Sequence, residues 1–138
     1  MRRKLSNAVG VRLFKLNYDK VMEELKRYAK RIIRDGRAKA VILVGSLARG
    51  DYTAFSDADV IIIADNVPRR PVDRIAEFID PTLSIDIQPI VYTTREILKM
   101  AEEKRRIVRE VVKYGILLAG DKTILATLAR KLKDEENK

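Results

Sequence analysis

Residues 45–59 read GSLARGDYTAFSDAD and decide most of what this 138-residue sequence predicts. They lie between two short apolar runs, at residues 40–44 and 58–64, which are rich in β-branched side chains and typical of buried strands. Gly45 ends the first run, and residues 47–49 can form a helical turn. The sequence therefore predicts two core strands joined by a turn and a polar loop.

Three aspartates of this region form a candidate metal site. In a strand, the side chains of Asp57 and Asp59 point to the same face. Two such carboxylates repel, and a core-facing pair is costly without a cation. Asp86 lies near the start of a third apolar segment, residues 83–92, and joins the pair if that strand is a neighbour in register. Three carboxylates can hold two metal ions about 4 Å apart. Because carboxylates are hard oxygen ligands, we expect two Mg²⁺ ions, with Mn²⁺ as the alternative.

The Gly45-Ser46 turn is a candidate phosphate site. Its backbone amides and the Ser46 hydroxyl can bind an anion, and glycine lets the backbone approach phosphate oxygens closely. The segment lacks the Gly-Lys-Ser/Thr ending of a Walker A loop and the spacing of a dinucleotide fingerprint. A phosphate cradle that faces metal-binding carboxylates implies a nucleoside triphosphate, attacked at its α-phosphorus.

Composition narrows the chemistry further. The sequence contains no cysteine and no histidine, which excludes disulfides, thiolate nucleophiles, Cys/His zinc sites and an imidazole base. The net charge of +9 is uneven, because an acidic middle (residues 40–94) lies between basic flanks. Basic surface favours polyanions such as nucleotides or RNA, and solvated helix faces are the equally weighted alternative. No apolar run has the length of a membrane span, so we expect a cytoplasmic protein.

The remaining pattern predicts a single α+β domain over residues 1–138. A short extended lead-in at residues 11–17 precedes a helix capped by Asn17 and ended near Gly36. A helix is expected over residues 71–81, and a capping box at 93–96 opens another that runs to about residue 114, with a polar middle that could bend. A brief strand at 116–118 and a last helix follow. The prediction is a three-stranded core sheet with a core of about 18–121 and flexible tails at 1–10 and 134–138; Pro89 places its strand at an edge or in a bulge.

The motif resembles that of a known superfamily. Residues 45–50 (GSLARG) and 56–60 (SDADV) are similar to the signature of the DNA polymerase beta-like nucleotidyltransferases, above all the minimal nucleotidyltransferases that pair with HEPN-domain proteins. The resemblance covers residues 18–121. It implies the fold of the polymerase beta-like nucleotidyltransferases, which is a small mixed β-sheet flanked by helices. It also implies that Asp57 and Asp59 hold both metals, and that Asp86 holds the catalytic metal and helps to deprotonate the acceptor hydroxyl. Ser46 would contact the triphosphate, with Arg49 beside it.

These inferences predict an enzyme that transfers a nucleoside monophosphate, AMP from ATP, to a hydroxyl of a protein or RNA. By analogy with the minimal group, the chain could be the antitoxin of a HEPN-domain toxin. Two alternatives remain: an antitoxin that acts by contact without catalysis, and an RNA-binding module that uses the basic flanks. Arg49 could instead form a structural ion pair with Asp51 or Asp57. The base preference, the acceptor and a homo-oligomeric state stay open.

Overall fold

A computed structural model describes the backbone of residues 2–134 and the side chains of residues 17–133. Its centre is a mixed four-stranded sheet with the order β3-β2-β1-β4. The strands are β1 (Ala40–Val44), β2 (Ala58–Ile63), β3 (Ile87–Tyr92) and β4 (Ile116–Gly120). β1 pairs antiparallel with β2 and with β4, whereas β2 and β3 are parallel.

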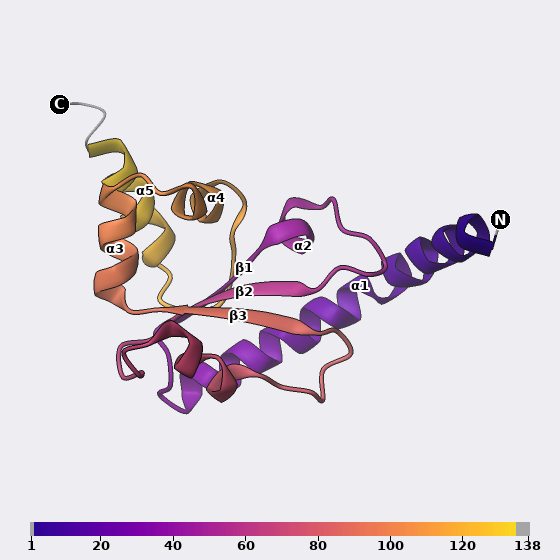
Figure 1. The fold of residues 1–138 in the computed structure, drawn as a ribbon, viewed down its shortest axis with the longest axis horizontal. Coiled ribbons are helices and arrows are strands. Elements are labelled where there is room, and N and C mark those ends of the chain that lie inside the picture. Colours follow the sequence, from indigo (N-terminus) through magenta and orange to yellow (C-terminus); the bar gives the residue numbers. More distant parts are fainter. Residues whose placement is uncertain (1, 135–138) are drawn as a thin grey trace.

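Helices cover both faces of this sheet. They are α1 (Arg2–Arg34), α2 (Gly45–Arg49), α3 (Thr94–Glu102), α4 (Arg106–Tyr114) and α5 (Ile124–Asp134), with 3₁₀ turns at Pro71–Arg74 and Ala76–Phe78. Figure 1 shows α1 running along one face, while α3, α4 and α5 gather at the other. The short helix α2 stands at the end of β1, where β2 and β3 begin.

Each face of the sheet contributes to its own hydrophobic core, because side chains alternate along a strand. Leu43 and Ile62 pack against the face of α1 that carries Leu25 and Tyr28. Ile42 packs on the opposite side, in the core formed by α3, α4 and α5. Every residue of β1 is buried, as its apolar run predicts. This central strand therefore belongs to both cores and holds the turn at Gly45 in place.

The predicted α+β class and the mixed sheet are confirmed. The segment at residues 116–118 is part of a fourth strand of the sheet, β4, so the prediction of a three-stranded core sheet was one strand short. Pro89 lies in β3 at the sheet edge, as predicted, because an edge strand tolerates the missing donor. Gly36, with φ of 73°, ends α1 where expected.

Several helix predictions need correction. The extended lead-in at residues 11–17 and the cap at Asn17 are wrong, since α1 continues through them from Arg2 and so includes residues 2–10 of the expected tail. The helix expected at 71–81 is two 3₁₀ turns. The helix expected to begin at the capping box of Thr93 does so, but it breaks at Lys104, whose φ is 58°. The tail predicted at 134–138 lies outside the residues described in full.

No helix in the described part of the chain combines the length and apolar character needed to cross a bilayer.

Candidate active site

The parallel pairing of β2 and β3 brings Asp57 and Asp86 to the same edge of the sheet. Each aspartate directly precedes its strand, and Ala58 pairs with Ile87. The amide of Ala58 donates to the carbonyl of Asp86 at 2.9 Å. The predicted neighbouring register is therefore the one observed, and it depends on a pairing of residues far apart in the sequence.

The antiparallel pairing of β1 and β2 places Asp59 against the turn at Gly45. Val44, the last residue of β1, pairs with Asp59. Gly45 has φ of 75°, and a Cβ at this position would lie 2.3 Å from Oδ2 of Asp59. Only glycine fits here, because a side chain would meet the carboxylate and the backbone is left-handed. The predicted turn and one predicted carboxylate thus form a single contact.

The two aspartates at the start of β2 interact electrostatically. The pKa of Asp59 is raised above its usual value, first because the side chain is half-buried and next because the charge of Asp57 is close. Glu110 raises the pKa further, while Arg49 lowers it. A positive charge placed beside the two carboxylates would oppose both effects and lower the pKa of Asp59 again.

This donor set fits a hard divalent cation, because two oxygen ligands with a mutual repulsion are what such a cation relieves. Asp86 is less closely placed. Among the residues whose side chains are described, no three acidic groups converge tightly enough to surround one ion. The structure thus brings Asp57 and Asp59 together, with Asp86 beside Asp57 on the adjoining strand.

Ser46 lies in the first turn of α2 and is linked to the loop that follows it. Its hydroxyl donates to Oγ of Ser56 at 3.1 Å, and the same Oγ accepts from the amide of Thr53 at 2.8 Å. The loop is also attached to α1, since the rings of Tyr18 and Tyr52 stack with centroids 5.2 Å apart. Ser56 was not among the predicted site residues, and its role comes from the loop's folded path.

Arg49, at the end of α2, forms two ion pairs. Its Nε lies 3.3 Å from Oδ2 of Asp51, and its Nη1 pairs with Glu110 on α4. The predicted pair with Asp51 is confirmed, and the partner Glu110 was missed because it lies 61 positions away. Arg49 therefore connects α2, the loop and α4 beside the aspartates.

Gln88 is a third residue that sequence reasoning missed, after Ser56 and Glu110. Its Nε2 donates to Oδ2 of Asp57 at 2.8 Å. Gln88 pairs with Asp59 in the parallel register. Its position two residues after Asp86, on the same strand face, was the one available signal. The amide fixes the direction of a carboxylate that would bind metal, as residues behind metal ligands do.

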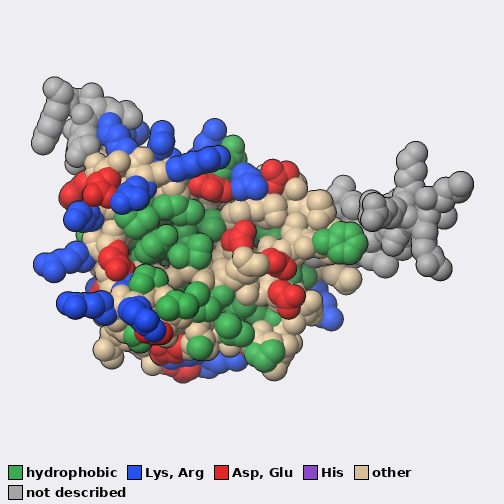
Figure 2. All heavy atoms as spheres, in the orientation of Figure 1, with side chains coloured by type: hydrophobic (Ala, Val, Ile, Leu, Met, Phe, Trp, Pro, Cys, Tyr) green, Lys and Arg blue, Asp and Glu red, His purple; other side chains and the backbone are tan. Residues whose placement is uncertain are grey.

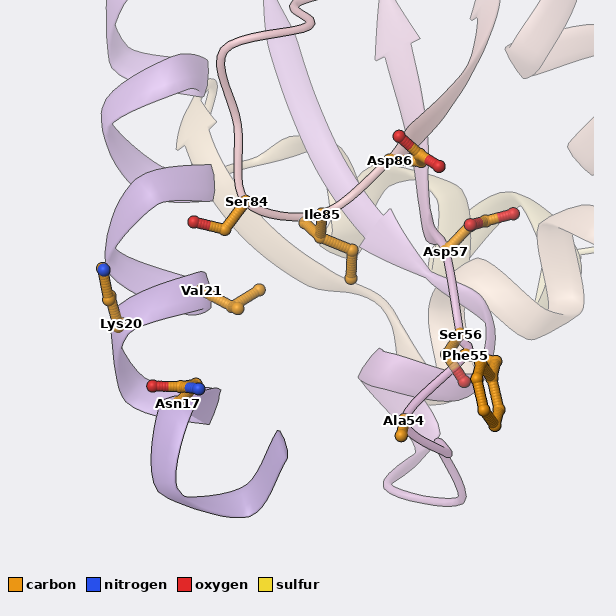
Figure 3. A pocket seen from close by; sticks show the side chains of 10 residues that line it. All are labelled: Asn17, Lys20, Val21, Ala54, Phe55, Ser56, Asp57, Ser84, Ile85 and Asp86. Atoms are coloured by element: carbon orange, nitrogen blue, oxygen red, sulfur yellow. The ribbon is translucent and has the colours of Figure 1, made fainter. Parts of the chain in front are cut away.

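A cavity of about 410 Å³ opens beside Asp57 and Asp86. Figure 3 shows Asn17, Lys20 and Val21 of α1 on one side and the segment 54–57 on the other, with Ile85 between them. Figure 2 shows acidic side chains gathered where β2 and β3 begin. The volume is that of a small-molecule site.

Comparison with known proteins agrees with this geometry. Residues 19–118 match the model of the nucleotidyltransferase domain family. Over 100 residues, 70% of this chain and 93% of the relative, the sequence is 32% identical to MJ0141 of Methanocaldococcus jannaschii, a proposed protein adenylyltransferase. A second relative from that organism, MJ0604, carries the same description and is 46% identical over 50 residues, 36% of this chain and 49% of the relative.

Solved structures share the fold. A chain of a toxin–antitoxin crystal structure with AMP-PNP matches with a TM-score of 0.57 and 20% identity over 81% of this chain and 86% of that chain. A chain from the complex of the tri-AMPylated Shewanella oneidensis HEPN toxin with its MNT antitoxin matches with a TM-score of 0.52 and 14% identity, over 87% of each chain.

Proposed function

Because this chain belongs to the nucleotidyltransferase domain family, we propose that it transfers AMP from ATP to a hydroxyl group of a partner protein. Nucleotidyl transfer is the family's chemistry. The donor, the acceptor and the metal requirement are the proposed part.

One observation carries the proposal: the Gly45 turn is in direct contact with Asp59, and Asp59 is coupled to Asp57. A phosphate at the turn would therefore lie next to the carboxylates that are to hold its counter-ion. The cavity beside Asp57 and Asp86 adds space for the remainder of a substrate. Such pre-positioning is the main source of rate in phosphoryl-type transfer.

The residues have separate roles in the proposed reaction. Asp57, Asp59 and Asp86 would hold the Mg²⁺ ions, which supply charge neutralisation at the α-phosphate and on the departing pyrophosphate. The acceptor oxygen forms a bond to the α-phosphorus, and the bond from that phosphorus to the bridging oxygen breaks. Asp86 takes the proton of the hydroxyl. Ser46 and Arg49 orient the phosphates, once Arg49 exchanges a carboxylate partner for phosphate oxygen.

A protein acceptor is favoured over RNA by the names of the relatives. MJ0141 is proposed to adenylylate protein, and one matched structure contains an AMPylated HEPN toxin. We therefore propose a HEPN-domain protein as acceptor, with this chain as its antitoxin.

The test is transfer of label. Wild type, Asp57→Asn/Asp59→Asn and the matched variant Asp35→Asn/Asp73→Asn are incubated with Mg²⁺, ATP labelled at the α-phosphorus and a co-expressed HEPN-domain protein from the same genome. The control pair removes the same charge from exposed aspartates away from the site. We expect label on the partner with wild type and control, and at least about a hundredfold less with the site variant, as when metal-centred charge stabilisation is lost.

The outcomes separate the candidate functions. Neutralisation of the toxin by Asp57→Asn/Asp59→Asn without any transfer by wild type would favour the contact antitoxin. Label recovered on RNA and not on protein would overturn the protein acceptor.

A further inference from the structure

A row of cations lies on α4 beside the candidate active site. Arg106, Arg109 and Lys113 are spaced for one face of a helix, and all three are exposed. With Arg49, Glu110 and Tyr114 they line a pocket of about 530 Å³. The pocket therefore contains four positive side chains and one carboxylate.

This pocket adjoins the catalytic carboxylates. Arg49 connects the two, because it pairs with Glu110 on α4 and is the last residue of the short helix α2, whose first residue, Gly45, is in contact with Asp59. A ligand that reaches Arg49 from Asp59 thus enters the α4 pocket next. Figure 2 shows Lys and Arg side chains gathered along the edge where Figure 1 places α4.

The α4 cations have few partners of their own. Within residues 17–133, neither Arg106 nor Arg109 is within ion-pair distance of a carboxylate. Lys113 lies 5.2 Å from the centre of the Tyr114 ring. The opposite side of α4 packs in the core through Val108 and Val111. Packing therefore fixes the direction in which these cations point, without neutralising them.

We propose that the α4 pocket binds the β- and γ-phosphates of the donor nucleotide and the pyrophosphate that leaves. This inference rests on the proposed function, since a polyphosphate needs such a pocket only beside the bond that breaks. A chain of two or three phosphates carries several negative charges over a short length. It therefore matches a cluster of cations better than a ligand with only one carboxylate group would. Glu110 limits the affinity and so favours release of the product.

The experiment is calorimetric titration with inorganic tripolyphosphate, pyrophosphate and AMP. The proteins are wild type, Arg106→Gln/Arg109→Gln/Lys113→Gln, and a matched control, Arg27→Gln/Arg95→Gln/Lys99→Gln. The control removes three exposed cations, also two arginines and one lysine, from α1 and α3. Circular dichroism checks that each variant is folded.

We expect the α4 variant to bind tripolyphosphate about tenfold to a hundredfold more weakly, the sum of three partly screened charge contacts. Its affinity for AMP should change by less than about twofold, and so should the control's affinity for tripolyphosphate. Glu110→Gln should bind tripolyphosphate about threefold more tightly, because a repulsive charge is removed. The loss in the α4 variant should shrink as salt is added.

Equal losses in the α4 variant and the control would show that net charge alone attracts the anion, and would overturn the proposal. So would an unchanged affinity in the α4 variant, or wild type that does not bind tripolyphosphate. These results are separate from the label-transfer test. If wild type transfers label but the α4 variant binds tripolyphosphate as well as wild type does, the proposed α4 pocket is wrong and the proposed function stands. If tripolyphosphate binding depends on the α4 cations but wild type transfers no label, the proposed function is wrong and the polyphosphate pocket stands.

Discussion

Gly45 combines a backbone conformation that favours glycine with a direct contact to Asp59 of the candidate site. Its φ of 75° is a left-handed value, and Asp59 occupies the space where a side chain would be. Gly36 offers a close comparison, since its φ is 73° and no atom lies within 4 Å of the Cβ position. The two glycines share a backbone requirement and differ in what surrounds them.

Alanine substitution at these glycines is the prediction at this scale. Gly36→Ala should lower the free energy of unfolding by about 1 kcal/mol through the left-handed backbone alone. Gly45→Ala should cost about 1–3 kcal/mol more, because the new methyl group collides with Asp59. It should also abolish Mg²⁺-dependent ATP binding, which Gly36→Ala leaves intact. Urea denaturation and calorimetry measure the two effects; equal effects on stability and binding at both positions would contradict the contact.

Individual site residues were predictable to the extent that local spacing marks them. Gly45, Ser46, Asp57 and Asp59 lie within fifteen positions and form a recognisable motif. Gln88, Ser56 and Glu110 were not predictable in this way. Gln88 needs the parallel register of β2 and β3, and Glu110 needs the packing of α4 near α2.

At the scale of elements, Arg74 ties the 3₁₀ turn at Pro71–Arg74 to β3 and α3. Its side chain is 3% exposed and donates to the carbonyls of Pro68, Arg69 and Val91. It also forms an ion pair with Glu96 at 2.7 Å, and this contact lowers the pKa of Glu96. A buried guanidinium with four partners stabilises an otherwise irregular segment.

Arg74→Ala is therefore expected to be destabilising. Loss of the donor leaves the buried carbonyl of Val91 unsatisfied and removes the ion pair with Glu96, at a cost of about 2–4 kcal/mol in the free energy of unfolding. The control Arg70→Ala, which removes an exposed arginine paired with Asp73, should cost less than about 0.5 kcal/mol. The measurement is the urea midpoint at neutral and acid pH.

The pH dependence follows from the sign of the Glu96 shift. Because the pKa is lowered in the folded state, the ion pair stabilises the fold above the usual pKa of a glutamate. This stabilisation by the ion pair is lost as the pH falls through the lowered pKa of Glu96 in the folded state. The difference between wild type and Arg74→Ala should narrow in acid, and a difference that widens there would contradict this assignment.

Elements with a strong local signal were predicted well, and those governed by tertiary contacts were not. The strands at 40–44 and 58–63 follow from apolar runs, and the helix start at Thr93 follows from its capping box. The 3₁₀ turns near Arg74 depend on a buried cation that a helical pattern does not reveal. The polar stretch at 102–106 suggested a bend, and the structure has a complete break there.

At the scale of the whole molecule, β1 makes the two cores one cooperative unit. Ile42 faces the core of α3, α4 and α5, and Leu43 faces the core of α1; both are fully buried. Because β1 supplies buried side chains to both cores, unfolding of this strand would expose both of them to water. The sequence predicted burial of this strand, but the order of strands, including the parallel neighbour β3, depends on long-range pairing.

Ile42→Ala and Leu43→Ala should each lower the free energy of unfolding by about 2–5 kcal/mol. Each variant should still unfold in one transition, since both cores share the strand. Far-ultraviolet circular dichroism and tyrosine absorbance are compared during urea denaturation. Separate midpoints for the two probes in either variant would show that the cores unfold independently.

The stacked rings of Tyr18 and Tyr52 give the molecule an optical property. The chain has five tyrosines and no tryptophan, so its aromatic spectrum above the phenylalanine bands comes from tyrosine alone. Two rings inclined by 16° at 5.2 Å couple electronically, and this pair joins α1 to the loop between Gly50 and Asp57. Near-ultraviolet circular dichroism of the unlabelled protein therefore reports on the position of the loop that borders the cavity beside Asp57 and Asp86.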